Sequence, residues 1–589
     1  MKKTIENRIK AFIGKSYASN RGKFYLLFVL LMVTLLINGC VNKSDPLSPQ
    51  SNLLISERNF CVDFAPNPAY TLISGFEEMG KIAKIDRGRI VPVAIASDER
   101  IRDFALGVEY IIPGFADVYA QTGVIWAKAA AVGCTWGDIE PQPPIAGKHS
   151  YHWDVVDRVL LEYQQAGFQH FHIYVRCMNR WASSKPIKPI GGGSWLPKPE
   201  YMEDYKAFLR AFVQRYDTNN PNHAPGLLYP VEYWEIESEW GTGFWQGTLV
   251  EYLELLNIAY PTIKMANPRS NVILIGFFLA GVFEGHPDPR EIPNTLAMMP
   301  AQQRRNTERY FADIKELLAH PNLFDVVEFH SLSDWSEIIG MSRFLRQTMH
   351  QYGYEKPIWV GDVNCTASPL VFWGIPVPPY TQKQKPAIDI TLQALANPNH
   401  PRHEEVEMWL RAEQSEGLVK KTVLAMAEGL SGINIGNLKD EPIFGVLPQI
   451  TGTTAFQGLI ETRGFPPGPG EPRPPYYALK LLAEKLSGFS KVIPLNIGEG
   501  IYAYQFTVQG QPIYVLWYDD GKRYLPGDAK PTIQVEIRLP QRQYLLTETP
   551  ITIDGLQTQV VMPSRGILKL RIGTVPLFLE PINEGMKTL

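Results

Sequence analysis

Apolar runs of strand length alternate with stretches of helical periodicity over residues 104–490. The runs are nearly continuous in apolar residues, as expected of parallel strands that are covered on both faces. Strands are predicted at Phe104–Tyr110, Val124–Val132, Gln169–Arg176, Glu232–Glu239, Val272–Phe277, Val326–His330, Pro357–Asp362 and Gly432–Ile435. Helices are predicted at Trp153–Ala166, Tyr201–Tyr216, Leu249–Met265, Asn306–Leu318, Ser336–Tyr352, Glu404–Glu428 and Tyr476–Leu486. Eight β/α units in a row favour an α/β fold closed into a (β/α)8 barrel over an open doubly wound sheet.

The pattern changes after Leu486. Short alternating strands are predicted at Ile501–Val508, Pro512–Trp517, Thr532–Leu539, Gln557–Val561 and Ile567–Ile572. This spacing predicts a small antiparallel β-sandwich. We therefore expect the barrel over residues 59–490 and a C-terminal β-sandwich domain over residues 491–589.

Two long segments rich in proline interrupt the barrel pattern, at Val363–His403 and Asn437–Pro475. Loops of this length in a compact domain are usually functional or disordered. We expect both to wall the cleft above the strand ends and to narrow access for a substrate.

The first forty residues resemble an export signal. Basic residues precede an uncharged, mostly apolar run at Phe24–Ile37, which is short for a spanning helix of about 20 residues. The stretch Leu36–Cys40 resembles a bacterial lipoprotein cleavage box, which implies a signal peptide over residues 1–40, lipidation of Cys40 and a tether over residues 41–58. The alternative is an uncleaved N-terminal anchor. Both export the chain and tether it to a membrane, facing the periplasm or the cell surface.

Composition removes several classes of function. The chain of 589 residues has a net charge of −3, which gives no electrostatic footprint for nucleic acid. An apolar fraction of 45% rules out wholesale disorder. No glycine-rich phosphate fingerprint follows an early strand, which weighs against dinucleotide binding. Besides Cys40, four cysteines remain, and their pairing stays open: Cys61, Cys134, Cys177 and Cys365.

Carboxyl groups occur where two of the predicted strands end. The active site of such a barrel lies at the C-terminal ends of its strands. The fourth strand ends with Glu235, Glu237 and Glu239, and the seventh ends with Asp362. Cleavage of a glycosidic bond requires one carboxyl group that protonates the leaving oxygen and a second that attacks the sugar or activates water.

These motifs resemble those of the clan-A retaining glycoside hydrolases, which are TIM-barrel enzymes such as β-xylosidase-like and cellulase-like proteins. Trp234–Glu239 is similar to the strand-four motif W-E-I-x-N-E, and Trp359–Asp362 is similar to the strand-seven motif W-x-T-E. Trp136–Pro141, followed by Tyr151, Trp153 and Asp157, looks like the clan's W-x-x-I-E-P…Y-x-W…D stretch after strand two. The resemblance covers most of residues 100–490.

The resemblance implies roles for individual residues. Glu239 falls on the acid/base, and Asp362 falls on the nucleophile. His330, at the end of the sixth strand, falls where the clan carries a His or Tyr near the nucleophile. Retention is implied for the reaction, and neither a metal nor an organic cofactor is needed.

Two residues depart from the clan's pattern. Ser238 replaces the Asn that binds the sugar 2-hydroxyl, and Asp362 replaces Glu, which shortens the nucleophile's arm. Retaining enzymes hold the carboxyl groups about 5–5.5 Å apart, whereas inverting ones hold them about 6.5–9.5 Å apart. One methylene is enough to impair a retaining site or to favour a water-mediated route, unless the backbone absorbs it. The sequence leaves these three outcomes open.

Other residues near the strand ends complete the candidate site. Glu235 and Glu237 share the face of Glu239 by strand alternation, and we expect Lys128 and Arg176 to pair with them. Aromatic residues that follow strands either stack on sugar rings or pack the loops: Trp181, Trp195, Trp240, Phe244, Trp245, Phe372, Trp373 and Tyr380. The residues predicted to bind substrate are Ser238, His330, Trp136, Trp181, Trp240, Arg176 and Trp245. No second His lies at ligand spacing from His330 for a metal.

The sequence therefore predicts an exported, lipid-anchored glycoside hydrolase that acts on a β-linked oligo- or polysaccharide. The alternative is a sugar-binding barrel lipoprotein that has lost turnover, and Ser238 and Asp362 motivate it. A purely structural envelope protein explains neither the paired carboxyl groups nor the aromatic loops.

Overall fold

The computed structural model describes residues 104–129, 133–187, 192–279, 282–283, 289–363, 370–372, 374–436, 439–440, 452–463 and 468–582. All of them belong to one compact unit. The predicted signal peptide, the lipidation site Cys40, the tether and Trp373 lie outside these residues. None of the helices in the described part of the chain is both long and apolar enough to cross a membrane.

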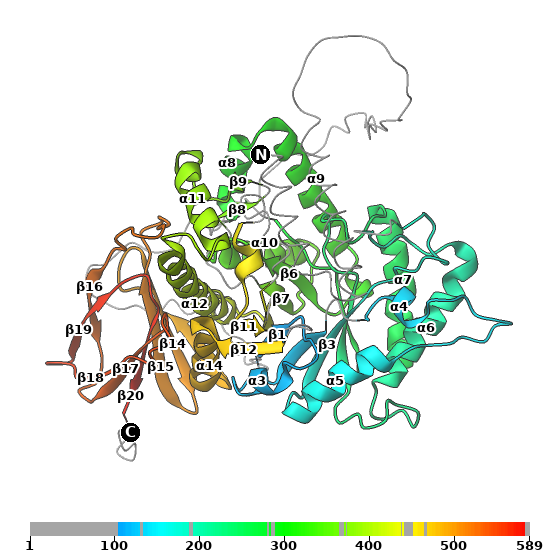
Figure 1. Ribbon diagram of the computed structural model, residues 1–589, viewed down its shortest axis with the longest axis horizontal. Helices are drawn as coiled ribbons and strands as arrows, with labels where there is room; N and C mark the ends of the chain where they lie inside the picture. The colour runs from blue at the N-terminus through cyan, green and yellow to red at the C-terminus, as the bar shows by residue number, and fades with distance from the viewer. Residues whose placement is uncertain are drawn as a thin grey trace, which may run out of the picture. The chain divides into compact units, whose positions relative to one another are not determined.

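A parallel sheet closes into the predicted barrel (Figure 1). Its strands are β1 (Ala105–Glu109), β2 (Trp126–Ala129), β3 (His170–Val175), β4 (Val231–Ile236), β5 (Asn271–Ile273), β6 (Val327–Ser331), β7 (Ile358–Val363) and β10 (Gly432–Ile435). Hydrogen bonding follows the order β5-β4-β3-β2-β1-β10-β7-β6. Parallel bridges from Ile273 to Val326 and from Phe277 to Phe329 join the two ends. The predicted fold class is confirmed, and the strands follow one another around the barrel in chain order.

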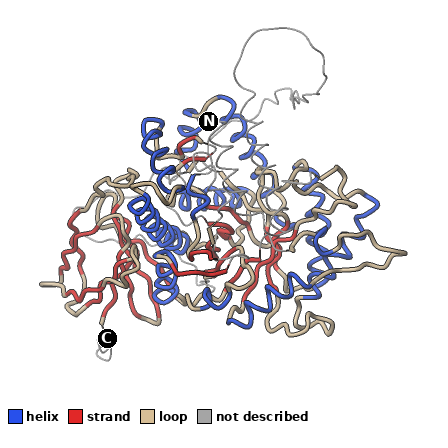
Figure 2. The backbone as a smooth tube through the Cα atoms, in the orientation of Figure 1, coloured by secondary structure: helices blue, strands red, loops and turns tan. Residues whose placement is uncertain are grey.

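Helices surround the barrel strands and bury apolar side chains in a core shared with them (Figure 2). Seven match the predicted segments: α5 (Asp154–Ala166), α6 (Met202–Arg215), α7 (Leu249–Ala266), α9 (Ala301–Leu318), α10 (Glu337–Gln351), α12 (His403–Ala427) and α14 (Pro474–Leu486). The start of α7 is fixed by a capping box between Thr248 and Glu251. Shorter helices are α3 (Ala116–Ala120), α4 (Trp136–Ile139) and α8 (Ile292–Met298).

The two proline-rich segments are not simple loops, and this part of the prediction is wrong. The first contains β8 (Val371–Phe372), β9 (Ile375–Pro376) and the helix α11 (Lys385–Ala396). The second contains β11 (Ile460–Arg463) and β12 (Gly468–Pro472), which pair as a hairpin. Helix α11 buries Ile388, Leu392 and Leu395, whose spacing is helical. The surrounding prolines mask that pattern.

The C-terminal domain is the predicted β-sandwich. Six antiparallel strands form one sheet in the order β13 (Phe489–Pro494), β14 (Ile501–Val508), β15 (Gln511–Tyr518), β20 (Leu577–Pro581), β17 (Tyr544–Glu548) and β18 (Thr558–Val561). A second sheet pairs β16 (Ile533–Arg538) with β19 (Ile567–Ile572). Apolar side chains of both sheets, including Leu516, Val535, Leu546 and Leu570, form a shared core. Strands β13, β17 and β20 were not predicted from the sequence.

Buried charges join the sandwich to the barrel. The Arg523 guanidinium, which follows β15, holds Asp334 in the loop before α10 through contacts of 2.5 and 2.8 Å. The ammonium of Lys530 lies 2.6 Å from the carboxylates of Glu413 and Glu416 on α12. The sandwich thereby fixes the loop that follows β6, the strand that carries His330.

Candidate active site

Glu239 and Asp362 meet inside the C-terminal end of the barrel. Glu239 lies three residues beyond β4 and bridges Gly276, and Asp362 lies near the end of β7. Glu239 is 8% exposed and Asp362 is 4% exposed, so both residues are buried. One oxygen of each carboxyl group and one ring nitrogen of His330 all lie within 4.8 Å of one another. This upper limit on the oxygen–oxygen distance is compatible with the roughly 5–5.5 Å of retaining glycosidases and lies below the roughly 6.5–9.5 Å of inverting ones.

A β-bulge brings Asp362 to this position. Phe329 of β6 pairs with Val360 of β7, but the next residue, His330, pairs with Asp362, so Gly361 is an extra residue in β7. A bulge bends its strand and redirects the side chain that follows. Only glycine fits, because a Cβ at Gly361 would lie 1.7 Å from Glu328 Oε1. The carbonyl oxygen of Gly361 accepts a hydrogen bond of 3.1 Å from Lys128 Nζ.

His330 connects two carboxylates. Its Nδ1 lies 2.8 Å from Glu239 Oε1, and its Nε2 lies 3.1 Å from Glu328 Oε1. Burial disfavours the charged imidazolium, but the hydrogen bonds to Glu239 and Glu328 outweigh it and raise the pKa of His330 well above its usual value. Burial likewise acts to raise the pKa of Glu239, but the contact with His330 leaves that pKa below its usual value. Glu239 is therefore ionised beside an imidazolium when no substrate is bound.

Asp362 has the opposite environment. Burial raises its pKa, the charge of His330 opposes that effect, and the charge of Glu239 adds to it, so the pKa lies above its usual value. Its Oδ2 accepts a hydrogen bond of 3.1 Å from the Tyr110 hydroxyl, while Oδ1 has no hydrogen-bond partner among the described residues. A Cβ at Gly436 would lie 2.3 Å from that oxygen, so glycine keeps space beside it.

A buried lysine organises the charges beneath the two carboxyl groups. Lys128 Nζ lies 2.9 Å from Glu235 and Glu328 and 3.2 Å from Glu109. The predicted pairing of Lys128 with Glu235 is confirmed. Burial opposes the charge of Lys128, but these three carboxyl groups raise its pKa well above the usual value. Contacts thus run from Lys128 through Glu328 and His330 to Glu239.

The same lysine argues against a metal at this level of the barrel. His172, Glu235 and Glu328 each offer a ligand atom within 4.8 Å of the others. The ammonium of Lys128 already lies 2.9 Å from both carboxylates and supplies the positive charge there. Burial, followed by the charge of Lys128, lowers the pKa of His172 to about 3, so its imidazole is neutral.

Arg176 binds protein groups. Its Nε lies 3.5 Å from Glu237 Oε2, which confirms the predicted pair, and Nη2 donates to the carbonyl oxygen of Phe244 at 2.9 Å. Glu237 Oε1 accepts a hydrogen bond of 2.7 Å from the backbone of Cys177. Arg176 therefore holds the loops after β3 and β4 together, and we do not retain it as a substrate ligand.

The predicted sugar-stacking tryptophans are mainly packing residues. Trp136 is fully buried and donates to Glu140 at 2.9 Å, so it offers no surface to a substrate and the prediction for it is withdrawn. Trp240 and Trp245 are buried against Tyr252. Trp181 is half-buried and packs edge-on against Trp136. An aromatic side chain in a loop uses the same apolar surface to pack against the protein or to stack on a sugar ring. Residue type alone therefore does not distinguish packing residues from sugar-binding ones.

Two further residues at the site, Tyr110 and Glu328, were not predicted, and one predicted residue, Ser238, makes no side-chain hydrogen bond to a described residue. Tyr110 and Glu237 adopt positive φ angles of 56° and 65°, which is rare outside glycine and clusters at functional sites. No feature of the sequence predicts a positive φ angle at these two residues. Glu328 was also missed, although strand alternation places it on the same face as His330. Ser238 is half-buried, and its hydroxyl has no hydrogen-bond partner among the described residues.

Comparison with known proteins finds only distant structural similarity. No family model matches the chain, and no curated protein matches it. Among solved structures, it is similar to a glucosidase from Croceicoccus marinus, with 9% identity, a TM-score of 0.48 and coverage of 82% of this chain and 96% of that one. It is also similar to a GH86 protein in complex with neoagarooctaose, with 10% identity, a TM-score of 0.49 and coverage of 82% and 75%. At such values these similarities carry no argument about activity, and the proposal below rests on the chain's own residues.

Proposed function

We propose that this protein is a glycoside hydrolase that cleaves O-glycosidic bonds of a β-linked oligo- or polysaccharide. The observation that carries the proposal is the pair of buried carboxyl groups, Glu239 and Asp362, whose oxygens approach within 4.8 Å at the C-terminal end of the barrel. This is the place and the chemistry that glycosidic cleavage needs.

The reaction that this spacing supports is retaining. Glu239 serves as acid/base and Asp362 as nucleophile, as the motif resemblance implies. Asp362 attacks the anomeric carbon while Glu239 protonates the leaving oxygen, and water then hydrolyses the glycosyl-enzyme with Glu239 acting as base. A gap this short favours retention over inversion, because inverting enzymes hold their carboxyl groups about 6.5–9.5 Å apart to accommodate a water.

The pair shares the one proton that this reaction requires. In the empty site burial raises the pKa of Asp362, whereas at Glu239 the contact with His330 outweighs burial and lowers the pKa. The productive form has the proton on Glu239 and the charge on Asp362.

Substitution of each carboxyl group tests the proposal. We expect Glu239→Gln and Asp362→Asn to reduce the hydrolysis of aryl β-glycosides and of β-glucan and xylan oligosaccharides by at least about 10³-fold. Glu232→Gln, which removes a half-buried carboxylate from the other end of β4, is the control. Undiminished activity in both site variants would overturn the assignment.

Chemical rescue separates the two roles. Azide should restore activity to Asp362→Gly by forming a glycosyl azide of inverted configuration, and it should give Glu239→Gly a product of retained configuration. NMR of the products distinguishes the two anomers. The opposite pattern would exchange the roles of the two residues.

The raised pKa of Asp362 also supports the second candidate, a sugar-binding barrel without turnover. A protonated carboxyl group does not attack a sugar, and Ser238 lacks the amide that the clan uses for the 2-hydroxyl. Binding of oligosaccharides by calorimetry with no hydrolysis after prolonged incubation would favour this candidate. Measurable turnover that Glu239→Gln abolishes would remove it.

We also propose export and lipid anchoring at Cys40, which rest on the N-terminal sequence alone. Cys40→Ala should abolish incorporation of a labelled fatty acid in a bacterial host and leave the precursor unprocessed. Labelling that persists in this variant would refute the assignment.

A further inference from the structure

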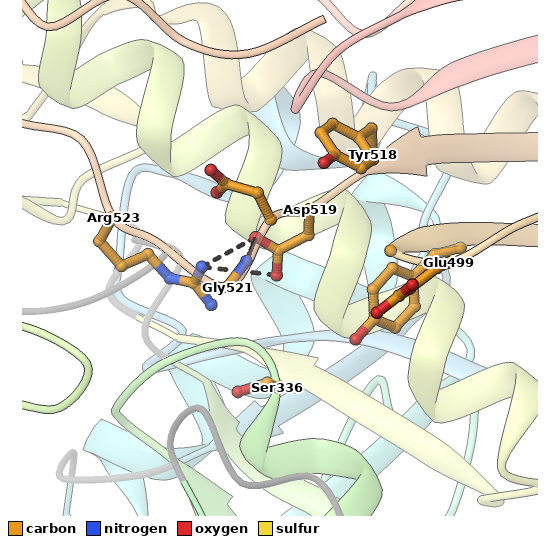
Figure 3. A pocket seen from close by; sticks show the side chains of 9 residues that line it. Ser336, Glu499, Tyr518, Asp519, Gly521 and Arg523 are labelled. Atoms are coloured by element: carbon orange, nitrogen blue, oxygen red, sulfur yellow. Dashed lines mark hydrogen bonds and ion pairs between the residues drawn. The ribbon is translucent and has the colours of Figure 1, made fainter. Parts of the chain in front are cut away.

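A cavity of about 450 Å³ lies between the sandwich and the loop before α10, apart from the candidate active site. Its volume falls within the roughly 300–1,000 Å³ of small-molecule sites. Its lining comes from that loop, from the turn before β14 and from the end of β15, as Figure 3 shows with Ser336, Glu499, Tyr518 and Asp519 around the space. The full lining is Ser336, Glu499, Gly500, Tyr502, Tyr518, Asp519, Asp520, Gly521 and Arg523.

The walls of this cavity are held in place by the protein itself. Arg523 fixes Asp519 through a contact of 3.1 Å and is itself held by Asp334 on the barrel side. Tyr502 stacks parallel to Trp517 with ring centroids 5.2 Å apart. Such supports preorganise a binding surface, which lowers the entropic cost of binding.

Glycine lets one aromatic ring lie against the backbone at the edge of the cavity. Gly500 has a φ angle of 69°, and a Cβ there would lie 2.9 Å from Tyr518 Cε2 and 2.6 Å from the carbonyl oxygen of Asp519. The ring of Tyr518 is half-buried, so part of it stays open. Aromatic rings with one open portion and a polar tip suit ligands that are both ring-shaped and hydroxylated.

The polar groups that remain available are acceptors and hydroxyls. Among the described residues, the hydroxyls of Tyr502 and Tyr518 and the carboxylate of Glu499 have no hydrogen-bond partner. Carboxylates accept hydrogen bonds from hydroxyl groups, and phenols both donate and accept. Three carboxylates and one guanidinium line the space, and Asp334 and Asp519 already pair that guanidinium. This excess of negative charge disfavours an anionic ligand.

We propose that this cavity is a second, non-catalytic binding site for a neutral β-linked glycan. Tyr518 provides the ring contact, and Glu499 accepts hydrogen bonds from sugar hydroxyls. The choice of a β-linked glycan rests on the proposed function, but binding here needs no hydrolysis. The site serves to keep a polymeric substrate on the enzyme between cleavage events.

Binding is tested in the full chain that carries Glu239→Gln, so that the probes are not hydrolysed. Loss of binding at this site is then observed separately from loss of hydrolysis. The probes are hexasaccharides of β-1,4-linked glucose, β-1,4-linked xylose and β-1,3-linked glucose, measured by calorimetry and by NMR transfer of saturation. We expect Tyr518→Ala and Glu499→Gln each to weaken one binding event at least tenfold for at least one probe. Tyr477→Ala, which removes an exposed tyrosine on α14, should leave binding unchanged.

In the otherwise unsubstituted chain, the same variants should keep the kcat/KM of the parent on aryl glycosides. Their kcat/KM on a polymeric substrate should fall several-fold. A hexasaccharide that carries uronate groups should bind at this site more weakly than its neutral counterpart. A melting temperature equal to that of the control shows that a variant folds. If Tyr518→Ala does not fold, the isosteric Glu499→Gln still provides the result. The proposal is overturned if none of the three probes binds, if both variants bind like Tyr477→Ala, or if the uronate probe binds as tightly as the neutral one.

Discussion

Removal of His330 should move the pH profile of hydrolysis. The His330 ring lies 2.8 Å from Glu239 Oε1, and Asp362 is within 4.8 Å of the same groups. In His330→Gln a positive charge disappears from beside both carboxyl groups, so each one binds its proton more readily. The singly protonated pair, which is the productive form, then persists to higher pH. We therefore expect both limbs of the kcat/KM profile to shift upward.

The size of this shift follows from the contact that is lost. A hydrogen bond to a charged group contributes about 1.5–3 kcal/mol, and 1.36 kcal/mol corresponds to one pH unit in a titration. The bond is buried, so solvent screens it little. The profile on an aryl β-glycoside should therefore move by about 1 to 2 pH units toward alkaline pH.

The matched control is His350→Gln, which removes a histidine that pairs with Glu355 at the protein surface. Its profile should match that of the unsubstituted chain. If His330→Gln lost activity at every pH while both limbs stayed in place, the histidine would serve only to hold Glu239 in position. A shift toward acidic pH would refute the electrostatic argument outright.

Two further outcomes follow from the packing and the charges. Gly436→Ala places a Cβ 2.3 Å from Asp362 Oδ1 and should lower kcat at least tenfold, whereas Gly468→Ala, with no atom nearer than 3.8 Å, should leave kcat unchanged in the same assay. Arg523→Met strands the buried Asp334 and should lower the free energy of unfolding in urea by about 3–5 kcal/mol. Burial acts to raise the pKa of Asp334, but Arg523 outweighs burial and leaves that pKa below its usual value. The pair therefore stabilises the fold above the unfolded-state pKa of about 3.9. This stabilisation is lost as the pH falls through the lower pKa of the folded state. A denaturation series that shows the same acid sensitivity with and without Arg523 would contradict this account.

The barrel could be predicted because its strands are buried on both faces. Such strands are continuous apolar runs, and the alternation with amphipathic helices fixes their number and direction. The β-sandwich was harder, because β17 and β20 are mostly apolar runs of only five residues each, too short to separate from loops. Helix α11 was missed because the prolines around it dominate the local composition.

The candidate site was predictable only where the chemistry depends on strand periodicity. Glu235, Glu237 and Lys128 were placed and paired correctly because alternate residues share a face. The contact of Tyr110 with Asp362 depends on a positive φ angle, which local sequence does not encode for tyrosine. Trp136 was singled out by its place in the motif that resembles the clan's stretch after strand two, and that motif does not show that its side chain is fully buried.

The short arm of Asp362 is absorbed by the backbone. Relative to glutamate, aspartate withdraws the carboxyl group by roughly 1 Å, yet its oxygen lies within 4.8 Å of Glu239 because the bulge at Gly361 advances the strand. A full-length arm on the same bulge would therefore overshoot toward Glu239 and His330. We expect Asp362→Glu to lower kcat on an aryl β-glycoside at least tenfold while the melting temperature changes little, with Asp325→Glu, a longer carboxylate placed just before β6, as the control. Higher activity in Asp362→Glu would show that the aspartate is a handicap and that the bulge does not compensate for it.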